Sequence, residues 1–547
     1  MKRALVVGVV GGAGVAAVTV GVTIGHWLLA VIGLVAAGLG LVGVFDLLQT
    51  QHSITRNYPV VGHLRFLLER IRPEIQQYFV ETNTAGTPFD RETRDLVYDR
   101  AKGNHGDEPF GTERDVNAVG YEFVAHSMRA RPKPDTPQPR VRLGGPRCTK
   151  PYDIALLNVS AMSFGSLSGQ AIEALNWGAA LGGFAHDTGE GSISRHHTAH
   201  GGDLIMEVAS GYFGCRTPEG RFDPDAFAAR ATLDQVKAIN IKLSQGAKPG
   251  LGGLLPGSKV NAEVAEARGV PVGTTVVSPP VHPEFSTPLE LIAFVDRLRD
   301  LSGGKPVGFK LCVGSRREFL AICKAMVASG SAPDFIIVDG SEGGTGAGPV
   351  EFEDHVGMPL TEGLMFVHNA LVGVGLRGQV RIGASGKVAT GIDIVKRICQ
   401  GADFTLAARA MMFAIGCIQA QTCHTNTCPV GVATQDPQRA RGLVVTDKKE
   451  RVFQYQEKTV NSARQIIASM GLDDFDQLSP RKLFRRVDPQ VTQTYQELFE
   501  WLEPEQLLTA PPTGWGRDWR EADADSFEPA SHLGRAEERP AMSRGDD

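Results

Sequence analysis

Eight short apolar runs lie between residues 151 and 432, and each ends in a loop rich in Gly, Ser or Asp before a helical pattern begins. Strands that alternate with helices indicate a parallel sheet covered on both faces. Eight such units in a segment of this length are typical of a (β/α)8 TIM-type barrel. A doubly wound open sheet is the alternative, but no G-x-G-x-x-G segment opens a helix after the first run. The expected strands are "DIALLNVSAMS", "GGFAHDTG", "LIMEVAS", "AINIKLSQG", "PVGFKLCVG", "FIIVDGSEGG", "VRIGASG" and "DFTLAAR".

The first 45 residues contain no Asp, Glu, Lys or Arg after Arg3. One helix of this length would measure about 63 Å, twice the hydrocarbon thickness of a bilayer. We therefore expect two transmembrane helices, about Ala4–Ile24 and about Trp27–Phe45. A cleaved signal peptide is the alternative. The basic residues before the first span favour a cytoplasmic N-terminus, so two spans would anchor the protein in the membrane with its catalytic domain facing the cytoplasm.

The remaining segments differ in composition. Residues 46–150 are charged and are expected to form helices and a linker, whereas residues 433–502 have helical patterns and are expected to form a helical extension of the barrel. Residues 503–547 are rich in Pro, Glu, Asp, Ser and Gly and are expected to be a disordered tail. The net charge of −5, with both signs mixed, gives no basic surface for nucleic acid.

Three of the eight cysteines lie in "CIQAQTCHTNTC", with the spacing C-x5-C-x4-C. This spacing differs from the C-x2-C pairs of structural zinc sites. His424 could complete a Cys3His zinc site, but it is adjacent to Cys423, and adjacent residues rarely bind one tetrahedral ion without strain. Three thiolates suit a [3Fe–4S] cluster, and the proline that follows echoes the ending of ferredoxin motifs. Three unrelated thiols are the remaining alternative.

Functional residues of a barrel lie at the carboxyl ends of its strands. The loops after the seventh and eighth strands often hold a phosphate there, because glycine-rich turns and helix N-termini present free N–H groups. Lys310 lies inside an apolar strand, where a buried amine needs a counter-ion or an acceptor. A phosphorylated flat cofactor, best matched by flavin mononucleotide (FMN), is the economical ligand. The residues expected to bind it are Ser160, Ala161, Met162, Ser163, Lys242, Lys310, Gly343, Gly344, Thr345, Gly383, Ser385, Gly386, Ala408 and Arg409.

Five motifs, in order along the chain, resemble the flavin domain of glutamate synthase: "SAMSFGSLS", "DTGEG", "SQGAKPG", "SEGGTGA" and "GC-x5-CHTNTCPVGVATQ". Over about residues 80–470 the chain is similar to stand-alone FMN-binding glutamate synthase family proteins. The resemblance implies a TIM-like barrel, FMN and a [3Fe–4S] cluster on Cys417, Cys423 and Cys428. It also implies that reduced flavin gives a hydride to 2-iminoglutarate, formed from 2-oxoglutarate and ammonia, with electrons from ferredoxin or a reductase subunit.

The resemblance implies roles for single residues. Gln245 and Lys248 fall on positions that hold the substrate, and Arg268 falls on a carboxylate-binding arginine. Glu190 matches an acidic residue of the active site that handles a proton or orients the imine. Glu190, Gln245 and Lys248 form the expected catalytic set. Lys310 matches a lysine near the flavin pyrimidine edge, where a positive charge stabilises the anionic reduced flavin.

Two departures from the family pattern leave the substrate open. Leu251 stands where glutamate synthases tend to carry an acidic residue. Full glutamate synthase begins with a cysteine nucleophile domain that releases ammonia from glutamine, so we expect this chain to use free ammonia or ammonia from a partner. Another amine or imine, or a membrane quinone, is the alternative substrate. A membrane scaffold without turnover is the non-catalytic alternative.

Overall fold

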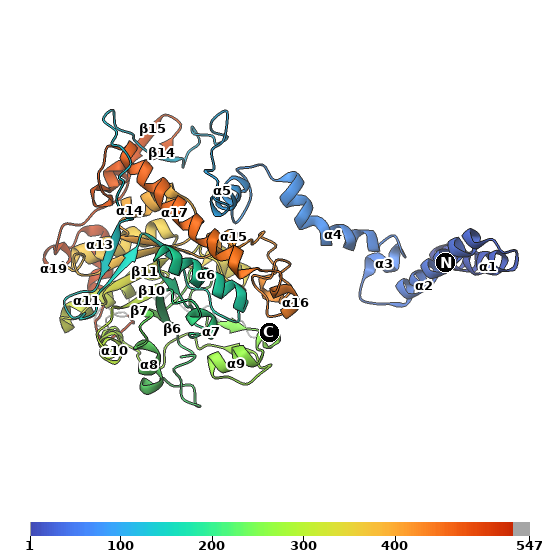
Figure 1. The fold of residues 1–547 in the computed structure, drawn as a ribbon, viewed down its shortest axis with the longest axis horizontal. Helices are drawn as coiled ribbons and strands as arrows, with labels where there is room; N and C mark the ends of the chain where they lie inside the picture. The colour runs from blue at the N-terminus through green and yellow to red at the C-terminus, as the bar shows by residue number, and fades with distance from the viewer. Residues whose placement is uncertain (1, 529–547) are drawn as a thin grey trace, which may run out of the picture. The chain divides into compact units, whose positions relative to one another are not determined.

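The computed structural model describes residues 2–528, and their side chains from Ala4 onward. The chain forms two compact units, Met1–Arg91 and Glu92–Asp547, shown from blue to red in Figure 1. The division falls inside the segment 46–150 that the sequence suggested as one piece. Each unit is therefore described by itself.

The first unit begins with two long helices, α1 (Lys2–Thr23) and α2 (Trp27–Leu48), joined by a tight turn. Small residues let their backbones approach closely, since a Cβ atom added at Gly33 would lie 2.5 Å from the backbone nitrogen of Val18. Both helices are long and apolar enough to cross a membrane. The unit continues with α3 (Ser53–Asn57), α4 (His63–Ile75) and the π-helical turn η1 (Gln76–Val80).

The second unit contains a closed barrel of eight parallel strands, in the order β10-β11-β12-β13-β4-β5-β6-β7. Each of the eight apolar runs supplies one strand, so the predicted (β/α)8 fold is confirmed. The first run is divided, because its beginning forms β3 (Tyr152–Ala155), which pairs with β2 (Arg140–Leu143) outside the barrel. The barrel strands are β4 (Leu157–Val159), β5 (His186–Asp187), β6 (Leu204–Val208), β7 (Val236–Lys242), β10 (Val307–Leu311), β11 (Phe335–Asp339), β12 (Arg381–Ser385) and β13 (Phe404–Ala407).

Two apolar clusters stabilise the barrel. The smaller one fills its interior and includes Ile205, Phe335, Phe404 and Leu406, and it also takes in Leu143 from β2. The larger one lies between the strands and the surrounding helices. The helices that follow the strands are α6 (Gly169–Gly182), α7 (Arg195–Thr198), α8 (Pro224–Ala231), α10 (Pro288–Leu301), α11 (Arg316–Ser329), α12 (Val350–His355), α13 (Leu360–Gly373), α14 (Gly391–Cys399) and α15 (Arg409–Ala414).

A long excursion leaves the barrel between β7 and α10. It contains β8 (Leu254–Leu255), the 3-10 turn η2 (Gly257–Lys259), α9 (Ala262–Arg268) and β9 (Val276–Val277). β8 and β9 pair as a small antiparallel ribbon. The excursion starts at the carboxyl end of β7, so its residues lie at the functional end of the barrel.

The segment after the barrel is only partly helical. Helix α17 (Val445–Ser469) packs against α6 and α14 and crosses the outside of the barrel (Figure 1), with α16 (Pro437–Ala440) before it. The expectation of a helical extension is wrong over 483–494, where β14 (Leu483–Asp488) and β15 (Val491–Thr494) form a hairpin. The partner of this hairpin is β1 (Glu122–Val124), which pairs with β14 from a distant part of the chain. A helix, α5 (Arg91–Ala101), precedes β1.

The expectation of a disordered tail is wrong for residues 503–528, whereas 529–547 lie outside the described residues. Short helices α18 (Tyr495–Leu498), α19 (Gln506–Thr509) and α20 (Thr513–Glu521) end the described chain. Trp515 stacks on Phe366 with ring centroids 5.0 Å apart, and the Arg316 guanidinium lies 4.8 Å from the Trp515 ring. Trp515 and Leu507 are buried in the outer core. A few well-placed apolar side chains thus order a segment whose composition is polar.

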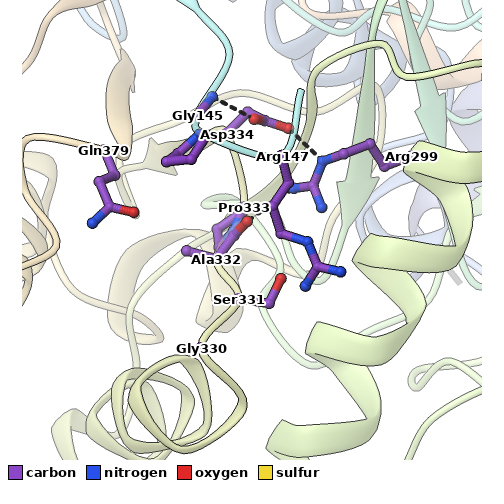
Figure 2. A pocket seen from close by; sticks show the side chains of 10 residues that line it. Gly145, Arg147, Arg299, Gly330, Ser331, Ala332, Pro333, Asp334 and Gln379 are labelled. Atoms are coloured by element: carbon purple, nitrogen blue, oxygen red, sulfur yellow. Dashed lines mark hydrogen bonds and ion pairs between the residues drawn. The ribbon is translucent and has the colours of Figure 1, made fainter. Parts of the chain in front are cut away.

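A small cavity of about 50 Å³ lies at the amino ends of the strands, opposite the functional end (Figure 2). Asp334 accepts hydrogen bonds there from Gly145 N and from Arg299 Nε, at 2.6 and 3.1 Å. Arg147 pairs with Asp296 at 3.0 Å. The two arginines are balanced by two carboxylates, so this network ties the 144–147 segment to the barrel and leaves no excess charge for a ligand.

Replacement of Trp515 by Ala should release the C-terminal segment. Truncating a buried aromatic side chain costs about 3–5 kcal/mol, so hydrogen exchange of the amides in 503–528 should become faster while exchange in the barrel strands changes little. Leu508→Ala is the matched control, because Leu508 is 44% exposed and its loss should cost under about 0.5 kcal/mol. Equal exchange in both variants would show that Trp515 does not hold the segment.

Candidate active site

A buried ion pair stands at the centre of the functional end. Lys310 on β10 contacts the Glu207 carboxylate on β6, and the two residues are 5% and 4% exposed. Burial opposes the charge of the amine, but Glu207, then Asp187 and Asp339, raise the pKa of Lys310 above its ordinary value. The counter-ion that the sequence required is therefore Glu207. It was missed, although its signal was present: it is the one charged residue in the apolar run "LIMEVAS".

Asp187 lies beside this pair at the end of β5 and is completely buried. Its carboxylate accepts hydrogen bonds from Gly189 N at 3.0 Å and from Asn240 Nδ2 at 2.9 Å. Burial, followed by the charge of Glu207, raises the pKa of Asp187 to about 7. A carboxyl group with such a pKa can hold or release a proton near neutral pH.

Glu190, in the loop after β5, is surrounded by cations. Its Oε2 lies 3.1 Å from Lys242 Nζ at the end of β7. Burial opposes its charge, but Lys242, Arg268 and Lys248 together lower the pKa of Glu190. Burial lowers the pKa of Lys248, which is 7% exposed. Three cations surround Glu190, and Glu353 is a second carboxylate that acts on Lys248, so the cluster keeps an excess of one positive charge, which suits an anionic ligand.

Arg268 joins the cluster from α9. Its Nη2 donates to Ser163 Oγ at 3.2 Å and to Phe164 O at 3.1 Å, and its guanidinium lies 5.1 Å from the Phe213 ring. The side chain is buried and holds the loop after β4 in place. Gln245 is half-buried in the loop after β7, three residues before Lys248. The substrate roles of both residues stay predictions.

A second group of cations gathers after β12 and β13. Ser160 Oγ and Ser385 Oγ lie 3.3 Å apart where β4 and β12 end. Gly386 follows with a φ of +145°, and Lys387 with a φ of +50°. Burial, followed by the charge of Arg409, lowers the pKa of Lys387. Lys387 and Arg409 thus lie within electrostatic range of each other, and the Glu342 carboxylate acts on both of them. Lys387 was missed, although it directly follows the expected strand run "VRIGASG".

The glycine-rich loop after β11 completes this end of the barrel. Arg409 Nη2 donates to Glu342 O at 2.6 Å. A Cβ atom at Gly344 would lie 2.7 Å from Arg409 Nε, so glycine is needed for the approach. Gly343 and Thr345 flank this contact. Asp339, at the end of β11, accepts a hydrogen bond from Gly246 N at 2.8 Å, which joins the loops after β7 and β11.

The other expected cofactor residues are placed differently. Ala161 and Met162 lie in the loop after β4, and Ala408 caps α15 at the end of β13. Gly383 lies within β12, where a Cβ atom would be 2.7 Å from the Phe404 ring. Gly383 therefore leaves space for the Phe404 ring inside the barrel and does not line the functional end.

The three clustered cysteines lie together on the loop after α15. Cys428 is buried, and Cys417 and Cys423 are partly buried. Burial raises the pKa of Cys417 to about 12, and the neighbouring Cys423 and Cys428 thiols raise it as well, so the three sulfurs lie within electrostatic reach of one another. Among residues 2–528, no three His, Cys, Asp or Glu side chains are arranged to hold a metal ion. The [3Fe–4S] cluster stays a prediction.

Lys259 connects the cysteine loop to the loops around Glu190. It is 3% exposed, and its amine donates to Ser166 O, Cys423 O and Ala433 O at 3.3, 2.7 and 3.1 Å. These carbonyls belong to the loop after β4 and to the cysteine loop, while Lys259 itself belongs to the excursion that carries Arg268. Sequence reasoning missed this residue, because a lone lysine in "PGSKV" gives no signal of its contacts.

A closed parallel barrel with ionisable groups at the carboxyl ends of its strands defines a (β/α)8 protein of the kind that serves as an enzyme. Residues 146–473 match the family described as "Conserved region in glutamate synthase". Because this match covers more than half of the chain, the protein belongs to the glutamate synthase family. The resemblance seen in the motifs is thereby confirmed.

Three relatives illustrate the range of the family. The chain is 38% identical to the glutamate synthase large subunit-like protein YerD of Bacillus subtilis over 81% of its length and 92% of that protein. It is 32% identical to the archaeal-type glutamate synthase [NADPH] of Thermotoga neapolitana over 58% of its length and 60% of that protein. The large chain of glutamate synthase [NADPH] from Azospirillum brasilense is 34% identical over 58% of this chain, which spans 20% of that protein.

The raised pKa of Asp187 predicts a pH dependence of stability. The folded state holds a proton that the unfolded state has lost above pH 4, so the free energy of unfolding should fall as pH rises from about 4 to about 7. The contribution is up to about 1.4 kcal/mol per pH unit. Asp187→Asn should remove it, as measured by denaturant unfolding at pH 5 and pH 8. Asp153→Asn, at an exposed carboxylate, should leave the slope unchanged; a wild-type slope in Asp187→Asn would contradict the assignment.

Lys259→Met should loosen the cysteine loop. Three carbonyls lose their buried donor, at a cost of about 1–3 kcal/mol for each group left unpaired. Hydrogen exchange should increase over 423–434 and in the loop after β4. Lys305→Met is the matched control, since buried Lys305 binds Ala231 O and Leu233 O at the other end of the barrel. If hydrogen exchange over 423–434 rises equally in both variants, the contacts of Lys259 do not specifically hold the cysteine loop.

Proposed function

We propose that the protein is a membrane-anchored, FMN-dependent oxidoreductase of the glutamate synthase type, with its catalytic unit facing the cytoplasm. In this proposal the substrate is 2-iminoglutarate, formed from 2-oxoglutarate and ammonia, and its reduction to glutamate would use a hydride that bound FMN would supply. The observation that carries it is the excess of buried cations around Glu190, beside the Lys310–Glu207 pair. Family membership supports the reaction type, since several relatives are named glutamate synthases.

The residues at the carboxyl ends of the strands fit FMN. Lys387 and Arg409 lie within electrostatic range of each other after β12 and β13, where Gly386 has a positive φ, so both cations could bind a phosphate there. Lys310 stays protonated beside Glu207 and would stabilise negative charge on a flat ring. When bound, FMN supplies the hydride. The chain's own residues hold its phosphate and fix the charge near its ring.

The cation cluster suits a dicarboxylate. Lys242, Lys248 and Arg268 exceed Glu190 in charge, and an acid such as 2-oxoglutarate carries two carboxylates that could balance the excess. Glu190 is kept ionised by these cations and can accept a hydrogen bond from an imine or take up a proton. Asp187, with its pKa of about 7, is a second proton carrier beneath the site.

Cys417, Cys423 and Cys428 are the residues that would hold a [3Fe–4S] cluster. The type and number of donors fit, because three cysteines on one loop suffice for a three-iron cluster, but their side chains are not gathered as metal ligands in the described residues. Such a cluster supplies single electrons from a donor such as ferredoxin or a reductase subunit. Lys259 binds the carbonyl of Cys423 and would fix the loop relative to the substrate residues.

A second candidate keeps the cofactors but takes another amine or imine, or a membrane quinone. Two observations favour it. Helices α1 and α2 could bring the protein to a membrane, which glutamate synthesis does not require. The excursion also exposes the apolar side chains of Leu251, Leu254 and Val277, at 40, 51 and 66%.

The test is glutamate formation by the anaerobically purified full chain with reduced ferredoxin, 2-oxoglutarate and ammonium. Lys248→Ala should lower kcat/KM by roughly 10–100-fold, the value of about 1.5–3 kcal/mol for a hydrogen bond to a charged group. Lys237→Ala is the control, since Lys237 pairs with Asp203 at the far end of the barrel and should leave the rate unchanged. Absence of glutamate from protein with full flavin and iron would reject the substrate, and flavin bleaching by another amine or a quinol would select the second candidate.

A further inference from the structure

Helix α4 (His63–Ile75) presents an apolar stripe that is left exposed within its own unit. No residue of the helix is buried. Leu64, Leu67, Leu68, Ile71 and Ile75 are each 40–55% exposed. Their spacing places them along one side of the helix within about 100° of arc. Such a stripe is normally covered.

The opposite side of α4 is polar or already packed. Phe66 lies against the His52 ring, with ring centroids 5.1 Å apart. Arg65 and Glu69 form an ion pair at 2.9 Å on the solvent side. Helix α4 therefore contacts its own unit through Phe66 on one side. Its leucines and isoleucines stay exposed on the opposite side.

Hydrogen bonds fix the start of α4 at the end of α2. Asp46 is 1% exposed, and its carboxylate accepts from Val60 N at 2.8 Å and pairs with His63 Nε2 at 2.8 Å. Helix α2 has 22 residues and is about 33 Å long, close to the hydrocarbon thickness of a bilayer. Asp46, near its last residue, would thus lie at the boundary between acyl chains and headgroups, and α4 begins at the same level.

The charges next to the stripe also fit a lipid surface. The segment from Gln49 to Ile75 carries four arginines, at positions 56, 65, 70 and 72, against two glutamates at positions 69 and 74. Basic residues next to a span are attracted to anionic headgroups. A basic helix with one apolar face is the usual form of a helix that lies in the membrane interface.

We infer that α4 is an interfacial helix, which inserts its apolar stripe into the surface of the same membrane that α1 and α2 span. The inference rests on the proposed membrane anchor and adds to it a specific lipid-binding surface. The apolar side chains of α4 would then contact the headgroups and the upper acyl chains of an anionic bilayer, where they would otherwise be exposed to water.

The test places a tryptophan on each face of α4 in the full chain. Leu67→Trp lies in the stripe, and Glu69→Trp lies on the polar side as the matched control. Each protein is reconstituted into vesicles of phosphatidylcholine and phosphatidylglycerol, with and without bromine on the acyl chains, and the emission added to that of wild type is measured. Bromolipid should quench the added emission of Leu67→Trp at least threefold more strongly than that of Glu69→Trp.

Two results would overturn the inference. If the Leu67→Trp emission is blue-shifted but not quenched by bromolipid, protein covers the stripe, from the same chain or a second copy. If it is red-shifted and quenched by iodide, the stripe lies in water. The wild-type protein tests the membrane anchor separately. Trp27 is the first residue of α2, and bromolipid should quench its emission whenever the two helices are inserted.

Discussion

The Lys310–Glu207 ion pair is the contact on which the functional end of the barrel depends. Both charged groups are buried there as a pair, because a buried charge without a partner strongly destabilises the folded state. Strands β6 and β10 must therefore keep their register on either side of β7, which hydrogen-bonds to both. Asp187 lies beside this pair, and its burial, followed by the charge of Glu207, raises its pKa.

The loops around this pair are connected by hydrogen bonds between chain segments distant in sequence. Gly246 N binds Asp339, Arg268 binds the loop after β4, and Lys259 binds the cysteine loop. Arg268 and Lys259 both come from the excursion after β7. That one segment thus carries Arg268 of the expected substrate site and also holds the Cys423 carbonyl of the cysteine loop.

Much of the fold could be predicted from the sequence, because the barrel strands are apolar runs that end in Gly, Ser or Asp loops. Glu190 and Lys248 stand in the motifs "DTGEG" and "SQGAKPG", which is why the sequence could propose them as site residues, whereas Arg268 lies outside the five motifs. Glu207 carried a local signal, as the one charged residue of an apolar run, but its partner Lys310 lies 103 residues away. Lys259 carried no local signal, since its importance comes from contacts such as the one with Cys423 O, 164 residues away. A local pattern contains no information about such contacts.

The errors have the same cause. The hairpin β14–β15 forms because strand β1, distant in the sequence, pairs with its edge. Residues 503–528 are ordered because Trp515 stacks on Phe366. Polar composition predicts disorder only when the few apolar residues have no apolar surface of the folded domain to pack against. Here the outer core supplies one, and a tertiary contact overrides the local preference.

The most direct test of the central claim is the visible and EPR spectrum of the anaerobically purified full chain, with flavin and iron counted in the same sample. The account predicts one FMN and about three irons per chain, with an EPR signal of an oxidised three-iron cluster. Colourless protein, or a chain that binds no flavin when FMN is added, would contradict the assignment of the barrel as a flavin site.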